Sequence, residues 1–219
     1  MTVLVLLGAP GAGKGTQAPI LAERLGIPVL ASGSLLRAAV ANGTALGREA
    51  DRYMSRGQLV PDATIVRVFL DRLEATDAVD GAILDGFPRT VVQAEALDDA
   101  LAEAGRRVDL AGYIEVPLEE LVVRMASRRI CTANGHVYNL VSNPPAVHGV
   151  CDIDGSELVQ RGDDHEATVR ARMAEQVPAL LEVVEHYRDH DVLRSVDGRQ
   201  SIGDVTDQLL ATVQGMRTA

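Results

Sequence analysis

The sequence predicts an α/β fold in which a mostly parallel β-sheet is covered by helices on both faces. Short apolar runs, the first of them at residues 2–7 (TVLVLL), are typical of strands buried on both faces. These runs alternate along the chain with stretches of helical pattern, as they do in parallel sheets joined by crossover helices. With 219 residues, the chain is long enough for one full domain that carries an inserted lobe.

The ends of the elements are marked by residues that favour or stop each structure. Gly26 and Gly105 each follow a helical stretch, and Pro117 opens another at the first-turn position that proline favours. We predict strands at 2–7, 27–31, 82–85, 108–116 and 192–196. We predict helices at 17–25, 34–42, 45–56, 62–75, 90–104, 118–126, 166–188 and 202–213.

Residues 127–164 break this alternation. They contain Gly135, Gly149, Gly155 and the run 143–145 (NPP), together with short β-like pieces such as 136–140 (HVYNL). Both cysteines of the chain also lie here. The segment is predicted to be a small β lobe inserted into the α/β body.

Composition limits the classes of function. A net charge of −10 argues against a general nucleic-acid or membrane-surface binder, which would favour a basic face. Two cysteines do not make the disulfide framework of a small secreted protein. Residues 2–7 lack a basic flank and are too short for a signal peptide or a membrane span. We therefore expect a soluble, cytoplasmic protein that binds neither nucleic acid nor membrane.

Residues 8–16 (GAPGAGKGT) form a glycine-rich loop between a buried strand and a helix, the context that a phosphate-binding loop requires. Backbone N–H groups of such a loop and the helix N-terminus behind it bind phosphate, and the lysine reaches the β- and γ-phosphates. Lys14 is the one lysine among 21 basic residues. A compact ammonium suits a tight loop better than a planar guanidinium. A glycine-rich turn without a ligand is the alternative interpretation.

A second group of polar residues follows the strand at 82–85. Asp85 ends that strand, where an acid in phosphate-loop enzymes orients Mg²⁺ through water. Its alternative interpretation is an ordinary turn before Gly86. Arg89 and Gln93 are four residues apart, so on a helix they would share one face. Together they offer a guanidinium for a phosphate and an amide for the edge of a base.

The motifs at 8–17 (GAPGAGKGTQ) and 84–90 (LDGFPRT) together resemble the adenylate kinase family in its long bacterial form. That family also has the order Lys-Gly-Thr at 14–16, where the general pattern wants serine or threonine directly after the lysine. The resemblance covers the whole chain. Further matching segments, in the family's order, are Gln58–Val60, Arg128–Arg129, Asn143–Pro145, Arg161, Asp163–Asp164, Thr168–Arg170 and Val196–Gly198.

The resemblance implies a fold and a division into three parts. The fold is a P-loop NTPase-type parallel sheet flanked by helices, with a helical AMP-binding lobe and a small β lid. The core would comprise residues 1–30, 61–126 and 165–219. The AMP-binding lobe would comprise 31–60, and the lid over ATP 127–164.

The resemblance also implies the roles of individual residues. The catalytic set would be Lys14, Asp85, Arg89, Arg128, Arg161 and Arg172. ATP would contact Gly11, Ala12, Gly13, Lys14, Gly15, Thr16, Arg124, Arg128, Val137, Tyr138 and Gly198. AMP would contact Ser32, Arg37, Gln58, Leu59, Val60, Gly86, Phe87, Pro88, Arg89, Gln93, Arg161 and Arg172. Mg²⁺ would accompany ATP, and lid closure would exclude water from the reaction.

Two positions depart from the family. Residues 32–37 read SGSLLR where the family usually has Thr-Gly-Asp-x-x-Arg, so Ser34 replaces a carboxylate. We expect Ser34 to cap the next helix about as well as aspartate would. Reduced activity or altered nucleotide preference is the alternative.

The lid is the second departure. Zinc-containing relatives have Cys-x2-Cys followed by Cys-x2-Cys or Cys-x2-Asp, and the four positions here are Cys131, Asn134, Cys151 and Asp154. Asparagine is a poor zinc ligand, although His136 lies nearby and could replace it. Because the ligand set is incomplete, we do not expect structural zinc, and Cys131, Cys151 and Asp154 are a weak candidate site.

The sequence thus leads to three hypotheses. The first is a monomeric enzyme that transfers a phosphoryl group reversibly from MgATP to AMP and gives two ADP. The second keeps the fold but accepts UMP, CMP or another nucleoside monophosphate; Gln93 and the long lid favour adenine. The third is a non-catalytic nucleotide sensor, against which the intact Lys14, Asp85 and Arg89 argue.

Overall fold

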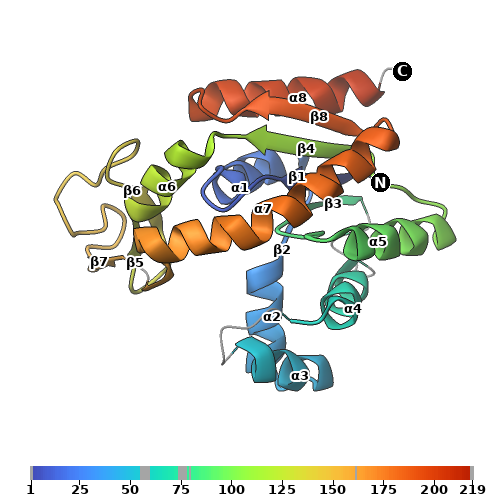
Figure 1. Ribbon diagram of the computed structural model, residues 1–219, viewed down its shortest axis with the longest axis horizontal. Helices are drawn as coiled ribbons and strands as arrows, with labels where there is room; N and C mark the ends of the chain where they lie inside the picture. Colours follow the sequence, from blue (N-terminus) through green and yellow to red (C-terminus); the bar gives the residue numbers. More distant parts are fainter. Residues whose placement is uncertain (1, 55–59, 74–77, 79, 161, 218–219) are drawn as a thin grey trace. The chain divides into compact units, whose positions relative to one another are not determined.

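The computed structural model describes residues 2–54, 60–73, 78, 80–160 and 162–217 (Figure 1). The chain divides into two compact units. The first comprises residues 1–8, 13–115 and 178–219, and the second comprises 9–12 and 116–177. The boundary at 177–178 falls inside one long helix, next to Pro178, which lacks the N–H group of a normal helix bond.

The first unit is built on a five-stranded sheet in which all neighbouring strands are parallel, in the order β2-β3-β1-β4-β8 (Figure 1). The strands are β1 (Thr2–Leu7), β2 (Val29–Ala31), β3 (Gly81–Asp85), β4 (Leu110–Glu115) and β8 (Leu193–Asp197). The register pairs Leu6 of β1 with Asp85 of β3, so both strands end at the same edge of the sheet. The predicted α/β fold with a parallel sheet is therefore confirmed.

Helices cover both faces of this sheet. The helices of the first unit are α1 (Lys14–Leu25), α2 (Ser32–Ala41), α3 (Ala45–Met54), α4 (Asp62–Leu73), α5 (Val91–Glu103) and α8 (Ile202–Arg217), with the last part of α7 (Glu166–Asp189). Of these, α3 contacts α2 and α4. Helices α1 and α8 contact each other, and Leu209 of α8 lies against Gly112 of β4. On the other face, Val3 and Val5 join a core that includes residues of α4, α5 and α7.

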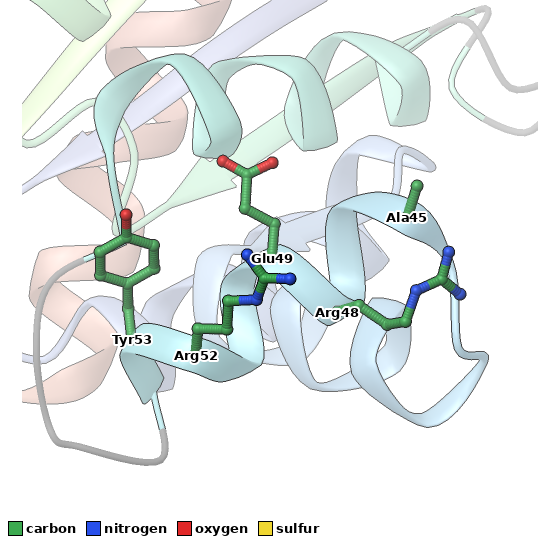
Figure 2. A pocket seen from close by; sticks show the side chains of 5 residues that line it. All are labelled: Ala45, Arg48, Glu49, Arg52 and Tyr53. Atoms are coloured by element: carbon green, nitrogen blue, oxygen red, sulfur yellow. The ribbon is translucent and has the colours of Figure 1, made fainter.

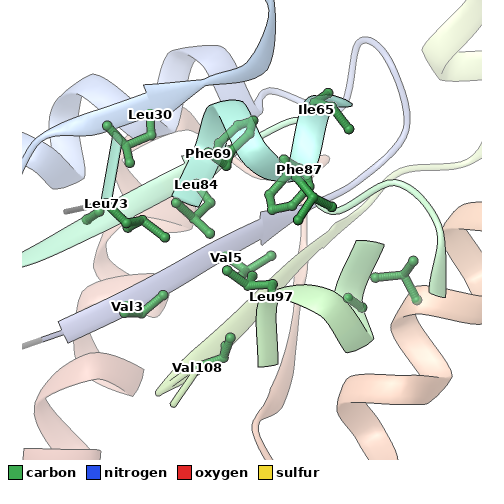
Figure 3. Close-up of a cluster of buried hydrophobic side chains, with 14 of the residues drawn as sticks. Val3, Val5, Leu30, Ile65, Phe69, Leu73, Leu84, Phe87, Leu97 and Val108 are labelled. Carbon is green, nitrogen blue, oxygen red and sulfur yellow. The ribbon is translucent and has the colours of Figure 1, made fainter. Parts of the chain in front are cut away.

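That core is mostly aliphatic, and its buried aromatic side chains among the described residues are Tyr187 and a stacked pair of phenylalanines (the pair is seen in Figure 3). Phe69 of α4 and Phe87 are both fully buried, and their rings stack with centroids 4.1 Å apart. Full burial of a side chain of this size contributes about 1.5–3 kcal/mol. The packing fixes the start of the segment 87–90, which carries the second polar motif.

The second unit contains the predicted inserted β lobe. Its antiparallel sheet has the order β6-β5-β7, formed by β5 (Arg128–Cys131), β6 (Val137–Asn139) and β7 (Leu158–Val159). It also contains α6 (Leu118–Ala126), the short helix η2 (Gly162–Asp164) and the first part of α7. Four buried side chains, Cys131, Tyr138, Cys151 and Leu158, form a small core of the lobe.

Two helices begin earlier than the sequence suggested. Helix α1 begins at Lys14 instead of residue 17, so Lys14 lies in its first turn. Helix α2 begins at Ser32, and its capping residue is Ala31, whose side chain makes no capping hydrogen bond. The expectation that Ser34 caps this helix was therefore wrong, because Ser34 already lies inside the first turn.

Candidate active site

The glycine-rich loop holds Lys14 at the N-terminus of α1. The Lys14 Nζ donates a hydrogen bond of 2.6 Å to the carbonyl oxygen of Gly8, the first residue of the loop. The N–H of Thr16 donates to the carbonyl of Gly13 at 2.9 Å, which closes the first helical turn behind the lysine. The ammonium is thus anchored by backbone at the carboxyl end of β1.

Gly11 has a backbone conformation and a packing contact that only glycine allows. Its φ of 86° lies in the left-handed region. A Cβ built at Gly11 would lie 2.9 Å from Cγ of Met125, on α6 of the same unit. A side chain at position 11 would therefore strain the backbone and collide with α6.

The charges around Lys14 oppose one another. Partial removal from water lowers the pKa of Lys14 to about 8; the negative charge of Asp85 raises it and the positive charge of Arg89 lowers it. Burial likewise raises the pKa of Asp85, against the opposing effect of Lys14 and Arg89. Lys14, Asp85 and Arg89 therefore form one electrostatic cluster at the edge where β1 and β3 end.

Arg89 is positioned by the turn that follows β3. Its Nε donates to the carbonyl of Gly86 at 2.8 Å, and Nη2 donates to the hydroxyl of the buried Ser32 at 3.1 Å. Gly86 has a φ of 73°, and a Cβ there would lie 2.8 Å from the Ser32 hydroxyl oxygen. The absence of a side chain at position 86 is what lets Ser32 and Arg89 meet.

Gln93 meets Arg89 in a different way from the one predicted. Helix α5 begins at Val91, with the Thr90 hydroxyl as its cap, so Arg89 lies before the helix and not on a common helix face. The backbone N–H of Arg89 donates to the Gln93 Oε1 at 2.7 Å. The Gln93 side chain is buried, 4% exposed, and its Nε2 donates to Asp62 at 2.6 Å.

The other residues assigned to AMP divide into three groups. Phe87 and Pro88 are buried, and the Phe87 ring packs in the core, so its side chain is not available to a nucleotide. Val60 is partly buried against the same core, and Arg37 belongs to α2. Gln58 and Leu59 lie outside the described residues.

The second unit carries the arginines that the sequence assigned to the lid side of the site, and two of them, Arg124 and Arg128, pair with an acid. Arg128 binds Asp164 with two hydrogen bonds, from Nε at 2.8 Å and Nη2 at 2.6 Å, and Asp164 is fully buried. Arg124 binds Glu120 one turn earlier on α6 at 2.6 Å. Arg172 lies on α7 and is partly exposed, and Arg161 lies outside the described residues.

Two further residues assigned to ATP differ in exposure. Val137 is 57% exposed on β6 and is available to cover a ligand. Tyr138 is buried, and its hydroxyl accepts the N–H of Asp152 at 2.8 Å. The Tyr138 side chain therefore belongs to the lid's own core. In the first unit, Gly198 follows β8, and its N–H donates to the carbonyl of Glu115 at 2.9 Å.

The lid also brings together four possible metal ligands, Cys131, His136, Cys151 and Asp154, whose donor atoms all lie within 4.8 Å of one another. Nδ1 of His136 is 3.3 Å from Sγ of Cys151 and 3.3 Å from the Asp154 carboxylate. Asn134 instead donates its amide N–H to Asp154 at 2.7 Å, which lowers the pKa of that carboxyl. His136 thus supplies the ligand that the zinc pattern expects from residue 134.

A hollow elsewhere in the first unit does not coincide with these residues. It has a volume of about 330 Å³ and is lined by Ala45, Arg48, Glu49, Arg52 and Tyr53 of α3 (Figure 2). Glu49 points toward α4, where the Thr64 hydroxyl donates to it at 2.6 Å. Among the described residues, none that the sequence assigned to a ligand lines this hollow.

Sequence reasoning missed two carboxylates that orient predicted site residues. Asp62, which binds Gln93, was noted only as the start of a helix. Asp164, which binds Arg128, was noted only within a matching segment. Neither had a local signal, because each partner lies more than thirty residues away, at separations of 31 and 36.

The adenylate kinase family model matches residues 6–192, which include the loop, the β3 turn and the lid. The chain belongs to the adenylate kinase family. It is 46% identical to the adenylate kinase of Thermodesulfovibrio yellowstonii over 211 residues, 96% of this chain and 98% of that protein. It is 44% identical to the adenylate kinases of Staphylococcus aureus strain Mu50 and Staphylococcus epidermidis over 207 residues, 94% of this chain and 96% of each relative.

Family membership confirms the resemblance and the P-loop type of the fold. The chain is therefore a nucleotide-binding kinase, an enzyme of the transferase class. Among the described helices, none combines the length and the apolar character needed to cross a membrane.

Proposed function

We propose that this chain transfers a phosphoryl group reversibly from MgATP to AMP, giving two ADP. The observation that carries the proposal is the cluster of Lys14, Asp85 and Arg89 at the edge where β1 and β3 end. Phosphoryl transfer needs positioning and charge neutralisation more than a covalent nucleophile. Two fixed cations and one carboxylate supply those needs.

On the ATP side, residues 11–16 would surround the phosphates with backbone N–H groups, and Lys14 would bind the β- and γ-oxygens. The residues present fit a magnesium ion, since Asp85 and the exposed Thr16 offer the oxygen ligands that Mg²⁺ prefers. When bound, Mg²⁺ neutralises charge on the phosphates. Asp85 would orient it through water, as in other phosphate-loop enzymes.

On the AMP side, Arg89 would bind the acceptor phosphate, and Arg37 would support it. The anchoring of Arg89 on Gly86 and Ser32 supports this role, because an arginine oriented in advance loses less entropy when it binds. Gln93 would read the base together with Ser32, and the resemblance adds the backbone of residues 58–60, of which only Val60 is described. Gly86 and Pro88 would line this site and contact AMP through their backbone.

On the lid side, further guanidinium groups would bind the phosphate oxygens; they belong to Arg124, Arg128, Arg161 and Arg172. The Asp164 carboxylate occupies two of the five N–H groups of Arg128, so within the described residues three remain for phosphate oxygens. Asp164 would thus act as a support that aims the guanidinium. Val137 and Gly198 would contact the adenosine part of ATP.

We also propose the division inferred from the sequence, with a core, an AMP-binding lobe at 31–60 and a lid at 127–164. Lid closure would exclude water, which could otherwise accept the phosphoryl group. We place the enzyme in the cytoplasm as a monomer, which is what the resemblance to its family implies.

The test is a coupled assay of ADP formation from ATP, with a panel of monophosphates as acceptors. Turnover with AMP well above that with UMP or CMP is expected. Preferred turnover with UMP or CMP would favour the second hypothesis. Tight ATP binding without turnover on any acceptor would leave only the sensor.

The lid cluster supports a second proposal. The expectation of no structural zinc depended on the missing ligand at position 134, and His136 now completes a set of two thiols, one imidazole and one carboxylate. The cluster fits tetrahedral zinc by donor chemistry, and we propose that it binds this ion. Stoichiometric zinc in the purified protein that is absent from Cys151→Ser is the expected result. A fully active, metal-free enzyme would overturn the proposal.

A further inference from the structure

The amide of Gln93 is held by two internal partners of opposite character. Its Nε2 donates to Oδ1 of Asp62 at 2.6 Å, and its Oε1 accepts the backbone N–H of Arg89 at 2.7 Å. A carboxylate can only accept a hydrogen bond, and a backbone N–H can only donate one. Rotating the amide by 180° would therefore place oxygen against oxygen and N–H against N–H.

Asp62 is itself held in place by its second oxygen. Its Oδ2 accepts the Thr90 hydroxyl at 3.2 Å, and that hydroxyl accepts the backbone N–H of Gln93 at 3.2 Å. The three residues form a closed ring between the first residue of α4 and the first turn of α5. The carboxylate of Asp62 therefore has a fixed position relative to the amide that it orients.

The fixed orientation determines what the amide can recognise. Within the described part of the chain, the two contacts leave one N–H and one oxygen lone pair of Gln93 for a ligand. A 6-aminopurine presents a ring-nitrogen acceptor beside an amino donor. A 6-oxopurine presents the reverse pair, a ring N–H donor beside a carbonyl acceptor, and an amide must turn over to change from one to the other.

We infer that Asp62 is a specificity-determining positioning residue: by fixing the Gln93 amide, it selects a 6-aminopurine monophosphate over a 6-oxopurine monophosphate. This inference rests on the proposed function, in which Gln93 reads the base of the acceptor. In this inference Asp62 acts through Gln93, to which its carboxylate is hydrogen-bonded.

Replacing Asp62 with asparagine tests the inference. An asparagine amide can donate or accept, so Asp62→Asn no longer opposes the turned orientation of the Gln93 amide, and of the two contacts only the backbone N–H of Arg89 still opposes it. The ratio of kcat/KM for AMP to that for IMP should fall, by up to about 10- to 100-fold, the discrimination that one pair of hydrogen bonds provides. The kcat/KM for ATP should stay within about twofold, because the donor site is separate.

The matched control is Asp71→Asn, which removes the same charge from an exposed position on the same helix and should leave the ratio unchanged. A second variant, Asp62→Ser, keeps a small polar side chain at the helix start and should lower the ratio in the same direction. Each ratio is measured on one preparation, so it does not depend on the fraction of folded enzyme.

A double-mutant cycle separates positioning from general damage. In a Gln93→Ala background, Asp62→Asn should no longer change the AMP-to-IMP ratio, because the amide that it orients is gone. An equal loss with both acceptors, or an effect that persists without Gln93, would overturn the inference. A wild-type enzyme that does not use AMP would instead overturn the proposed function itself.

Discussion

The phosphate-loop region and the lid cluster both hold a few polar side chains, but they hold them in different ways. In the first region, Lys14 and Arg89 donate to the backbone carbonyls of Gly8 and Gly86. In the lid, Cys131, His136, Cys151 and Asp154 contact one another through their side chains. The first arrangement orients charged groups from the backbone, whereas the second links the end of β5 to the loop residues His136, Cys151 and Asp154 through side chains.

Because of this difference, the first region contributes mainly to ligand binding and the second mainly to stability. A cation that is fixed by backbone oxygens keeps its charge available for an anionic ligand and loses little freedom when the ligand binds. A cluster whose members satisfy each other stabilises the segment that carries it, with or without an ion. Changes in the first region should therefore alter activity with little effect on stability, and changes in the second should do the reverse.

The largest effect is expected from Lys14→Arg. The guanidinium is wider than the ammonium and cannot donate from the same point, so kcat/KM should fall by about 10²- to 10³-fold with an unchanged melting temperature. The control is Arg24→Lys, the reverse exchange at an exposed position near the end of α1, which should leave activity unchanged. Near-normal turnover of Lys14→Arg would show that any cation suffices.

Cys151→Ser should show the opposite pattern. Cys151 is 1% exposed and contacts both His136 and Tyr138, so the change should destabilise the lid by about 1–3 kcal/mol. Limited proteolysis within 127–164 and thermal unfolding measure the effect. Val141→Ser, at a 70% exposed position of the same lid, is the control and should change neither. A loss of activity at full stability would contradict the comparison.

The pH dependence of ATP binding tests whether the positive charge of Lys14 binds the phosphates. Its pKa is about 8 instead of 10.5, and bound phosphates should raise it again. Affinity should then be level below pH 8 and fall by up to about tenfold per pH unit above it, with proton uptake on binding. Calorimetry in two buffers of different ionisation enthalpy measures the uptake, which should vanish in Lys14→Met. Constant affinity between pH 7 and 9.5 would refute the expectation.

The smallest effect is expected from Asn134→Ala in the lid. The variant removes the amide that donates to Asp154, so the pKa of that carboxyl should move back toward its ordinary value. Zinc affinity should fall by about tenfold, and activity should remain within twofold. A competition titration against a chelator measures the affinity. An unchanged zinc affinity would mean that Asn134 has no part in orienting the ligand.

The accuracy of the sequence-based predictions depended on how local each signal was. The strand at 2–7, the loop at 8–16 and Asp85 were all predictable, because hydrophobic runs and glycine spacing are read from neighbouring residues. The capping role of Ser34 and the shared helix face of Arg89 and Gln93 were wrong, since each depended on where a helix begins. The sequence assigned Phe87 to contact with AMP, but its ring is fully buried in the core, so only its backbone could make that contact.

The sequence by itself determined the parallel sheet, the phosphate loop and the choice of lysine at position 14, because these depend on side-chain pattern and local backbone freedom. Only the tertiary structure decided which way the Gln93 amide faces, which acid holds Arg128 and which residue completes the lid cluster. Asp62 and Gln93 are 31 residues apart, and they meet because packing brings the start of α4 against the start of α5. No local sequence pattern encodes this pairing. It arises because α4 and α5 precede and follow β3, and the position of β3 is set by its pairing with β1 and β2.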